Sequence, residues 1–413
     1  MKHRKTLAII LGGGKGTRLY PLTKERCKPA ISFGGKYRLI DIPISNCLHS
    51  GVNKIFILTQ FLTASIHRHI FQTYRLDMLS RGFIEVLPAE QTLASDEWYQ
   101  GTADAVRRSV RYIKNLQIDD VLILSGDQLC RMNYNEMLDF HRKRKAGLTV
   151  IGHPVNKTES KRMGIMKTNV DGRVKKLVEK PQDLSLVEGF QNPDGSYIAS
   201  TGNYIFKRDV LLDVLEKSKE DDFGREIIPN AIENYNVYMY PFNGYWEDIG
   251  TIKSFFYANL DLGAALPQFN LYDEQHQIFT HGRFLPAAKV QESTIKYTLI
   301  SEGSMIEKGS IESSVIGIRS VIKAGAVIKK SIIMGNDFYE RRLDNRKVKP
   351  SIGKNVRIEG AIIDKNVTIG NNVKIRGLQD PNKNFDHALY CVRDGIVVIS
   401  KGTKIPAGKV IKG

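Results

Sequence analysis

The chain has 413 residues, of which 42% are hydrophobic and 25% are charged, a composition typical of soluble globular proteins. This length predicts roughly two or three domains, each with its own core. No apolar run approaches the ~20 residues of a membrane-spanning helix, and the first residues do not read as a secretion signal, so we expect a cytoplasmic protein with no membrane partner. The four cysteines are far apart in the sequence, which excludes a disulfide scaffold and a Cys-x-x-Cys metal site.

Lys and Arg outnumber Asp and Glu by 61 to 44, which gives a net charge of +17 and favours an anionic partner. From Arg283 to the end of the chain there are 24 basic and 12 acidic residues, so much of the excess lies in the last third. These charges are scattered among Ile, Val and Gly, with no basic helix or aromatic strand surface beside them. We therefore expect small anionic metabolites and no nucleic acid.

Residues 1 to about 260 alternate strand-like and helix-like segments, which predicts an α/β domain around a mixed, mostly parallel, Rossmann-like sheet. The predicted strands are Leu7–Leu11, Lys54–Thr59, Phe83–Leu87, Val121–Leu124, Leu148–His153, Val174–Val178 and Val237–Pro241. The predicted helices are Thr63–Tyr74, Thr102–Asn115, Tyr134–Lys145, Arg208–Lys217 and Gly224–Asn234. Ligands of such sheets bind at the carboxyl ends of the strands.

A glycine-rich segment, LGGGKGTRL at residues 11–19, follows the first predicted strand. Glycines allow backbone N–H groups to approach phosphate oxygens, and Lys15 and Arg18 supply positive charge. The spacing fits neither a Walker A loop nor the Gly-x-Gly-x-x-Gly dinucleotide fingerprint. A phosphate-binding loop of another kind is favoured over a plain glycine-rich turn because further motifs accompany it.

Two carboxylates stand where a sheet of this kind binds ligands. Asp127 ends an apolar strand, and it lies too early to be the N-cap of the helix near Asn135. Asp248 occurs in similar surroundings, shortly before a helix near Lys253. A pair of carboxylates is what a Mg²⁺ ion that bridges phosphates requires.

Lysines and turn residues complete the set of candidate motifs. Lys28 and Lys180 each precede a proline, which extends the backbone; Lys28 reaches a triphosphate or is a solvated surface lysine. The segment WYQGTADAV at 98–106 predicts a nucleotide contact at a helix start, where Tyr99 flanks a sugar or is a packed aromatic. The segment ASTGNY at 199–204 contacts sugar hydroxyls or forms a β-turn.

The composition changes after residue 265. An apolar residue recurs every six positions, which predicts a parallel β-helix with short faces. The recurring residues are Ile300, Ile306, Ile316, Ile322, Ile328, Met334, Ile352, Ile358, Ile363, Ile369 and Ile375. We expect a catalytic domain at 1–265, a linker at 266–288 and the β-helix at 289–413. The charged insertion Asp337–Pro350 should loop out.

Together these motifs resemble the sugar-1-phosphate nucleotidyltransferases over essentially the whole chain, and most closely the cyanobacterial and plant branch of the glucose-1-phosphate adenylyltransferases. The resemblance implies a left-handed β-helix and a homotetramer or heterotetramer. It also implies that ATP and α-D-glucose 1-phosphate give ADP-glucose and diphosphate with Mg²⁺, the committed step of glycogen or starch synthesis.

The resemblance also implies residue roles. Catalysis falls to Asp127, Arg18, Lys28 and Asp248, and Asp127 and Asp248 hold the metal. ATP is bound by Leu11, Gly12, Gly13, Gly14, Gly16, Thr17, Gln91, Gly101 and Thr102. Glucose 1-phosphate is bound by Tyr99, Gly164, Glu179, Lys180 and Ser200. An anionic allosteric effector, phosphate or a compound like 3-phosphoglycerate, is bound by Arg26, Arg38, Lys365 and Lys401.

Five residues near the metal and sugar positions depart from the family pattern. Gln128 and Cys130 replace His and Tyr, Met163 replaces Phe, and Thr201 and Asn203 replace Met and Ile. Two alternatives therefore stay open: a nucleotidyltransferase for another nucleotide or sugar phosphate, and a catalytically weak regulatory subunit. Glu25 stands where fructose-bisphosphate-activated relatives have a lysine, which argues against that mode of activation.

Overall fold

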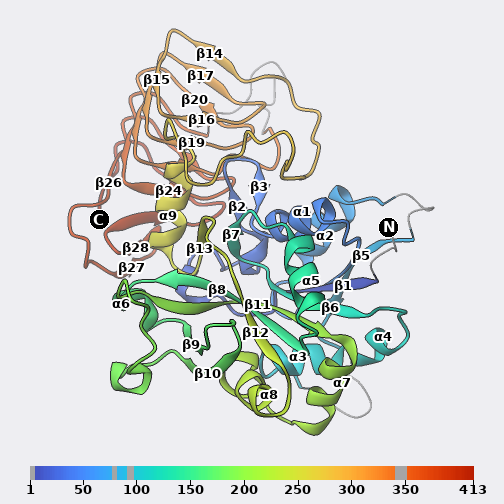
Figure 1. Cartoon of the computed structure of the whole chain (residues 1–413). Helices are drawn as coiled ribbons and strands as arrows, with labels where there is room; N and C mark the ends of the chain where they lie inside the picture. The colour runs from blue at the N-terminus through green and yellow to red at the C-terminus, as the bar shows by residue number, and fades with distance from the viewer. Residues whose placement is uncertain (1–4, 77–80, 91–96, 340–350) are drawn as a thin grey trace. The chain divides into compact units, whose positions relative to one another are not determined.

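The computed structural model describes residues 5–76, 81–90, 97–339 and 351–413. The chain divides into two compact units (Figure 1). The first consists of residues 1–14, 42–63 and 74–246, and the second of residues 15–41, 64–73 and 247–413. None of the helices in the described ranges combines the length and the apolar composition needed to cross a membrane.

A nine-stranded mixed sheet forms the centre of the first unit. Strands β6, β1, β4 and β5 run parallel in that order, and β11 runs antiparallel to β6, β8 and β9. The bounds are β1 (Thr6–Leu11), β4 (Lys54–Thr59), β5 (Phe83–Pro88), β6 (Asp120–Ser125), β8 (Leu148–Val155), β9 (Gly164–Thr168), β10 (Val174–Glu179), β11 (Tyr197–Lys207) and β12 (Val237–Pro241). The predicted strands are confirmed. The uninterrupted apolar runs of β1, β4 and β6 suit strands that are covered on both faces.

Helices cover both faces of this sheet. Helices α3, α7 and α8 lie on one side of it and α5 on the other (Figure 1). The helices of this unit are α1 (Asp41–His49, whose first residue belongs to the second unit), α3 (Thr102–Arg108), α4 (Val110–Lys114), α5 (Tyr134–Lys143), α6 (Lys157–Ser160), η4 (Leu184–Val187), α7 (Arg208–Lys217), η5 (Phe223–Ile227) and α8 (Ile228–Asn234). The short strand β7 (Gln128–Cys130) follows β6, and β13 (Trp246–Asp248) is where the chain passes into the second unit.

Two predicted helices are interrupted, so their predicted extents were wrong. The helix expected at 102–115 is two helices that meet at Ser109, whose hydroxyl donates to the carbonyl of Ala105. A serine bonded in this way competes with the regular backbone pattern. The helix expected at 224–234 begins as a π-helical turn, η5, before α8.

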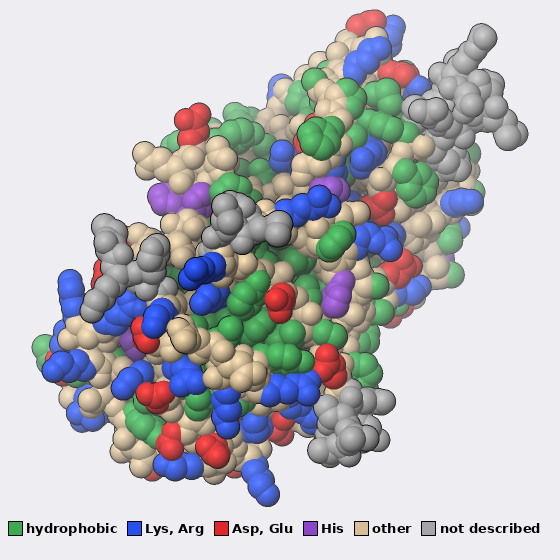
Figure 2. Space-filling view, turned by 90° about the vertical axis from the view of Figure 1, so that its right-hand side faces the viewer, with side chains coloured by type: hydrophobic (Ala, Val, Ile, Leu, Met, Phe, Trp, Pro, Cys, Tyr) green, Lys and Arg blue, Asp and Glu red, His purple; other side chains and the backbone are tan. Residues whose placement is uncertain are grey.

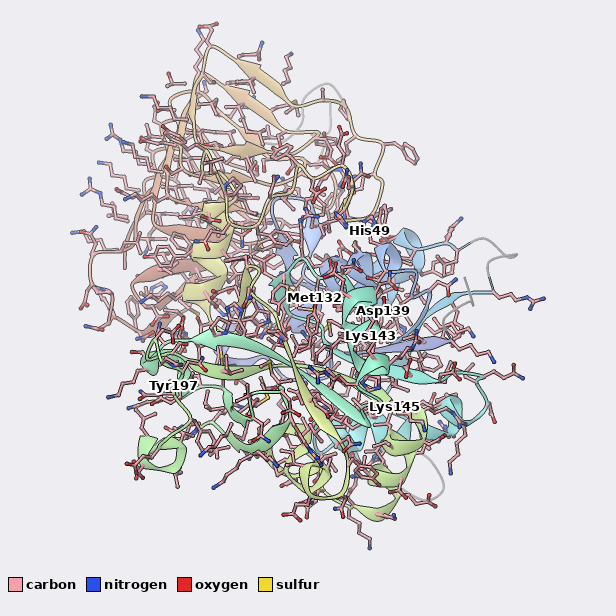
Figure 3. All side chains as sticks on the ribbon, viewed as in Figure 1. His49, Met132, Asp139, Lys143, Lys145 and Tyr197 are labelled. Atoms are coloured by element: carbon pink, nitrogen blue, oxygen red, sulfur yellow. The ribbon has the colours of Figure 1, made fainter. Side chains whose placement is uncertain are left out.

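The β-turn interpretation of residues 199–204 was also wrong, because these residues belong to β11. This strand begins at Tyr197, which Figure 3 labels. Its register shifts between Ser200 and Tyr204, and Gly202 has a φ of +76°. The small and polar residues of this segment therefore form a bulge in a long strand, and Gly202 adopts the left-handed backbone conformation that the bulge requires.

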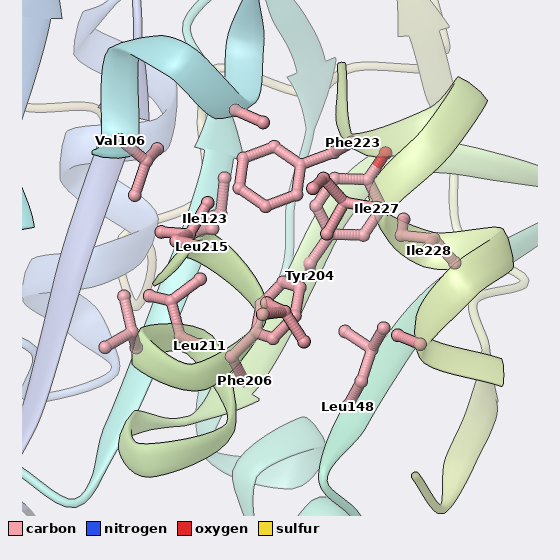
Figure 4. Packing of buried hydrophobic residues seen from close by; sticks show 14 of the residues in the cluster. Val106, Ile123, Leu148, Tyr204, Phe206, Leu211, Leu215, Phe223, Ile227 and Ile228 are labelled. Carbon is pink, nitrogen blue, oxygen red and sulfur yellow. The ribbon is translucent and has the colours of Figure 1, made fainter. Parts of the chain in front are cut away.

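Aromatic side chains fill the core on the α3/α7/α8 side of the sheet (Figure 4). The rings of Phe206 and Phe223 lie 5.7 Å apart, and Tyr204 lies 5.8 Å from Phe223. Val106 from α3 and Leu211 from α7 complete the same cluster. Each buried side chain of this size contributes ~1.5–3 kcal/mol, so this layer holds the strands whose ends carry the candidate site.

The second unit contains a parallel β-helix of three sheets. One sheet contains β14 (Lys289–Gln291), β17 (Met305–Glu307) and β20 (Val321–Ile322), and isolated bridges connect it to the pair β25 (Thr368–Ile369) and β30 (Lys404–Ile405). The next contains β15 (Thr294–Lys296), β18 (Ser310–Glu312), β21 (Val327–Lys329), β23 (Arg357–Glu359), β26 (Lys374–Arg376) and β31 (Val410–Lys412). The third contains β16 (Leu299–Ile300), β19 (Val315–Ile316), β22 (Ile332–Ile333), β24 (Ala361–Ile363), β29 (Ile396–Ile399), β28 (Tyr390–Arg393) and β27 (Phe385–His387).

The six-residue rhythm arises because each coil contributes one short strand to each of the three sheets, and each strand turns an apolar residue inward. Successive coils then stack these inward residues. One stack is Ile295, Ile311, Ile328, Ile358, Ile375 and Ile411. The described end of the predicted insertion is Asp337–Tyr339, whereas residues 340–350 lie outside the described residues.

The remaining elements of the second unit precede the β-helix. They are η1 (Thr17–Leu19), η2 (Lys28–Ala30), β2 (Ser32–Phe33), β3 (Tyr37–Arg38), α2 (Ala64–Thr73) and α9 (Ile252–Asp261). Residues 262–288, which include the expected linker, contain no helix or strand. The domain boundaries themselves stay a prediction.

Candidate active site

The glycine-rich loop leaves the carboxyl end of β1 between two other strand ends. Leu11 pairs with Leu58 of β4 on one side and with Ser125 of β6 on the other. The N–H of Gly12 donates to the carbonyl of Leu58 at 2.8 Å, and that of Gly126 donates to the carbonyl of Leu11 at 3.0 Å. The structure thus brings the predicted loop and the turn that carries Asp127 to one edge of the sheet.

The space around Gly14, the last loop residue in the first unit, is empty. A Cβ atom on Gly14 would meet nothing within 4 Å, whereas one on Gly13 would lie 3.4 Å from the Gln60 side chain. Gly14 also lacks a positive φ. The fold itself therefore does not require glycine at position 14, which leaves a close-fitting ligand as a reason for it.

The Asp127 turn is ordered by side chains around it. The hydroxyl of Ser125 donates to the Asp127 carboxylate, and the N–H of Ser125 donates to Asn203 Oδ1 at 3.0 Å. Helix α5 is capped by Asn133, whose side chain accepts from the N–H of Asn135. The N-cap interpretation of Asp127 is therefore excluded, as predicted.

Four of the residues predicted to bind the sugar phosphate lie together where β9 begins, β10 ends and the bulge of β11 begins. Gly164 pairs with Glu179 and with Ser200. A Cβ atom on Gly164 would approach Glu179 Oε2 to 2.6 Å, so a larger residue would displace that carboxylate. Lys180 Nζ lies 2.9 Å from Glu179 Oε1, and its side chain is 53% exposed. The cluster offers an acidic acceptor and a solvent-facing cation side by side.

Tyr99 lies elsewhere in the first unit. Its hydroxyl donates to the carbonyl of Pro88 at the end of β5, at 3.3 Å, and its ring packs against the core. Burial raises the pKa of Tyr99, and the neighbouring Glu90 raises it further. The packed-aromatic interpretation describes these contacts, and a sugar contact stays a prediction. Gln91, predicted to lie near the adenine, is outside the described residues.

Gly101 and Thr102 contact the segment 221–224, for which the sequence predicts only the start of a helix at Gly224. A Cβ atom on Gly101 would lie 2.2 Å from the carbonyl oxygen of Asp221, so glycine is required there. The hydroxyl of Thr102 accepts from the N–H of Phe223 at 3.1 Å. A Cβ atom on Gly224 would lie 2.9 Å from Glu179 Oε2. The segment thus connects the predicted ATP-binding turn with the sugar-phosphate cluster.

The other catalytic candidates lie in the second unit. Gly16 has a φ of +61°, and its carbonyl accepts from the hydroxyl of Thr23 at 3.1 Å. A Cβ atom on Gly16 would lie 3.3 Å from Lys28 Cβ, so the loop folds back onto this lysine. Lys28 Nζ lies 3.5 Å from Asp248 Oδ1, and its side chain is only 12% exposed. The solvated-lysine interpretation of Lys28 was therefore wrong.

Arg18 shares these surroundings. Gly250 follows Asp248, and a Cβ atom on it would lie 2.7 Å from Asp248 Oδ2 and 3.2 Å from Arg18 Nη2. Thr17 begins the short helix η1 that carries Arg18. Arg18, Lys28 and Asp248 thus form one cluster of two cations and a carboxylate, a charge pattern suited to a polyphosphate with a bound cation.

Two family models match this chain. The sequence model described as nucleotidyl transferase matches residues 7–264, which is more than half of the chain. The chain belongs to the nucleotidyl transferase family. A second model, the GLGC left-handed parallel β-helix domain, matches residues 283–410. The predicted fold class is confirmed: a nucleotidyltransferase domain with a mixed sheet, followed by a left-handed parallel β-helix.

The carboxylates of this nucleotidyl transferase fit magnesium in their chemistry. Within the described ranges, no group of three or more His, Cys, Asp or Glu side chains is placed to hold a metal ion. Asp127 belongs to the first unit and Asp248 to the second. One or two carboxylates suffice for Mg²⁺ when phosphates and water supply its other ligands. That both aspartates share one ion stays a prediction.

The residues predicted to bind an effector converge within the second unit. Asp337 lies 3.0 Å from Lys365 Nζ and 3.9 Å from Lys401 Nζ. Arg26 forms a buried ion pair of 2.5 Å with Asp364, the residue before Lys365. Local patterns do not pair these aspartates with their cations, because 338 positions separate Arg26 from Asp364 and 28 separate Asp337 from Lys365.

Arg38, the fourth of these residues, is partly buried beside other cations. Its guanidinium donates to the carbonyl of Ser65 at 3.1 Å. Burial lowers the pKa of Arg38 to about 10; Asp41 opposes this shift, whereas Arg26 and Arg283 add to it. Arg283 is a further cation of this group that sequence analysis had not singled out.

Burial also lowers the pKa of Lys365, to about 8, although Asp337 opposes the shift; Arg38 and Arg283 lower it further. The cations of this group thus repel one another within a poorly solvated region.

Proposed function

We propose that this nucleotidyl transferase is a glucose-1-phosphate adenylyltransferase, which converts ATP and α-D-glucose 1-phosphate into ADP-glucose and diphosphate. The observation that carries the proposal is the hydrogen bond from Gly126 to Leu11, because it sets the Asp127 turn against the glycine-rich loop. The GLGC-type β-helix fits this enzyme family and supports the choice of substrates. In this role the enzyme supplies the sugar nucleotide for glycogen or starch synthesis.

In this proposal, one set of residues binds ATP and another binds glucose 1-phosphate. The backbone of Gly13 and Gly14 approaches the triphosphate of ATP, whereas the N–H of Gly12 already donates to Leu58. Arg18 and Lys28 neutralise the charge of the triphosphate. Lys180 binds the phosphate of glucose 1-phosphate, and Glu179, Ser200 and the backbone at Gly164 contact the sugar hydroxyls. The carboxylate–lysine pair of Glu179 and Lys180 suits a ligand that carries both hydroxyl groups and a phosphate.

The reaction is an in-line displacement. A phosphate oxygen of glucose 1-phosphate attacks the α-phosphorus of ATP, and the bond from this phosphorus to the β-phosphate bridging oxygen breaks. The electron pair of that bond leaves with diphosphate, so no covalent enzyme intermediate is needed. The chain contributes positioning and charge neutralisation. Mg²⁺ held by Asp127 and Asp248 would neutralise charge on the phosphates.

We propose further that the cations of the second unit bind an anionic effector. A phosphate group placed among Arg26, Arg38, Lys365 and Lys401 would relieve the mutual repulsion of these cations. Release of that repulsion is free energy available for coupling effector binding to another conformation. The acceptors Asp337 and Asp364 hold the cations in place when no effector is bound.

Diphosphate release by the purified protein tests the proposal. The protein is incubated with Mg²⁺ and glucose 1-phosphate, and ATP, UTP, dTTP, CTP or GTP is supplied in turn. The proposal predicts turnover with ATP well above that with the other nucleotides. Preferred turnover with another nucleotide would reassign the protein to a sister activity, and no turnover with any of them would favour a regulatory subunit.

A further inference from the structure

The side-chain amide of Gln128 is the centre of a buried hydrogen-bond network in the first unit. Gln128 Oε1 accepts from Asn203 Nδ2 at 2.7 Å and from Trp246 Nε1 at 3.1 Å, and its Nε2 donates to the carbonyl of Thr201. The indole N–H can only donate and the carbonyl can only accept, so these two partners fix the orientation of the amide. Gln128 is 7% exposed, which leaves water little access to these bonds.

Asn203 carries this network to the Asp127 turn. Its Nδ2 donates to Gln128, and its Oδ1 accepts from the N–H of Ser125 at 3.0 Å. The hydroxyl of Ser125 in turn donates to the Asp127 carboxylate. A continuous path of hydrogen bonds therefore joins Gln128 to the carboxylate, although Asn203 and Gln128 are 75 positions apart in the sequence.

The same network includes the bulge of β11. Thr201 and Asn203 lie within the register shift between Ser200 and Tyr204, and Gly202 at its centre has a left-handed φ. A Cβ atom on Gly202 would lie 3.7 Å from Gln128 Nε2. Ser200, at the start of the bulge, pairs with Gly164 in the sugar-phosphate cluster. One amide thus connects the Asp127 turn with a strand of that cluster.

We propose that Gln128 is a positioning residue that acts through Asn203 and Ser125 to hold Asp127, and that it sets the distance between this carboxylate and the sugar-phosphate cluster. The inference rests on the proposed function, in which Asp127 faces the reacting phosphates. Gln128 and Asn203 each supply a hydrogen-bonding partner of the other. The two residues therefore act as a pair.

Removal of either amide leaves the other partly unsatisfied. Leucine at position 203 deprives the buried N–H of Ser125 of its acceptor, and leucine at position 128 leaves Asn203 and Trp246 without theirs. In both variants the Asp127 turn loses its fixed geometry. Because a displacement of ~1 Å in a reacting group costs up to ~100-fold in rate, the effect should fall on kcat rather than on KM.

The test compares Gln128→Leu, Asn203→Leu and the double variant with Thr149→Val. The control removes a buried 2.8 Å side-chain hydrogen bond between Thr149 and His141 in the same unit, and this bond involves none of the residues of the network. Two readouts are measured: amide hydrogen exchange of residues 120–128 without substrate or metal, and kcat and KM for ATP and glucose 1-phosphate. Thermal midpoints report the general loss of stability in each variant.

The proposal predicts that both single variants speed exchange at Ser125 about tenfold or more and lower kcat ~10- to 100-fold, with KM values within about threefold of wild type. The double variant should be little worse than either single variant, because the residues act through one path. Thr149→Val should keep both the exchange rate and kcat. Unchanged exchange in Gln128→Leu, or additive losses in the double variant, would overturn the proposal.

The two readouts separate this inference from the proposed function. Absence of turnover in the wild type would contradict the proposed function alone, since hydrogen exchange still reports whether Gln128 holds the turn. Normal kcat in Gln128→Leu together with an active wild type would contradict the positioning role alone.

Discussion

The backbone N–H of Gly126 donates to the carbonyl oxygen of Leu11, and this 3.0 Å hydrogen bond joins the end of β6 to the end of β1. It sets the turn that carries Asp127 beside a loop in which Gly13 is partly exposed and Gly14 is exposed. The relationship explains why two motifs separated by more than a hundred positions serve one ligand in the proposed reaction.

Replacement of Asp127 by asparagine should abolish most turnover. The amide keeps the shape of the side chain but removes the negative charge that the proposed metal site requires. We expect a loss of kcat on the order of 100-fold or more, with little change in the thermal midpoint. Steady-state diphosphate release and thermal unfolding check this prediction. Near-normal activity would remove Asp127 from the mechanism.

Gly14→Ala should damage ATP binding without damaging the fold. A Cβ atom there meets nothing within 4 Å and φ is not positive, so the added methyl group would clash only with a bound ligand. We expect KM for ATP to rise about tenfold while the thermal midpoint stays within about a degree of wild type. Gly282→Ala, at a position equally open and without a positive φ, is the matched control. Equal kinetics in the two variants would mean that residue 14 does not approach the nucleotide.

Lys180→Gln should weaken glucose 1-phosphate binding selectively. The variant removes a solvent-facing charge that pairs with Glu179 at 2.9 Å, and it leaves this carboxylate facing the phosphate. We expect KM for glucose 1-phosphate to rise ~10- to 100-fold, with KM for ATP nearly unchanged. Lys176→Gln on the same strand, where the side chain is exposed, should leave both KM values unchanged. An equal rise in both KM values would point to a general disturbance of the site.

His141 should make the protein sensitive to acid. Burial lowers its pKa from the usual 6.5 to about 4, with a smaller contribution from Arg142. As the pH falls from about 6.5 to about 4, the unfolded chain therefore takes up a proton before the folded one does, and stability is lost in this window.

Denaturant unfolding of wild type and His141→Gln at about pH 7 and about pH 4.5 checks the contribution of His141. The wild type should lose ~1–3 kcal/mol more than the variant between the two conditions. The same loss in both proteins would mean that other groups account for the acid sensitivity.

The response to an anionic effector should weaken as the pH rises through about 8. Lys365 is buried and its pKa is lowered to about 8, so its charge is lost in this range. Activation or inhibition by phosphate and 3-phosphoglycerate should decline in the wild type between about pH 7 and about pH 9. In Lys365→Gln it should already be ~10-fold weaker than in the wild type at about pH 7, and the two proteins should converge at about pH 9. Lys354→Gln, which removes an exposed lysine of the same unit, is the control. A response that is unaffected in Lys365→Gln would exclude this cluster as the effector site.

Local sequence patterns carried much of the fold. The apolar runs of β1, β4 and β6 predicted buried parallel strands, and the recurring isoleucines predicted the β-helix, because these patterns arise from side-chain burial alone. Helix α7 begins and ends where its amphipathic period predicted. Strand β11 was missed because its bulge places Gly202 and small polar residues inside a strand.

The side-chain partners of the site were beyond local patterns. Folding brings together distant segments to form the pairs Asn203 with Gln128 and Lys365 with Asp337. The sequence around each residue does not indicate its partner. The role of Gly101 was assigned to ligand binding alone, whereas its contact with Asp221 gives it a packing role as well. Residues that cluster on one strand edge, such as Gly164 and Ser200, were found by family resemblance and not by spacing.

The identity of the sugar nucleotide formed is the most direct test of the proposed function. The protein is given Mg²⁺, glucose 1-phosphate and an equimolar mixture of ATP, UTP, dTTP, CTP and GTP, and the products are identified by mass spectrometry. We predict ADP-glucose as the dominant product, formed in equal amount with diphosphate. A different nucleotide sugar as the main product, or no nucleotide sugar at all, would contradict the assignment.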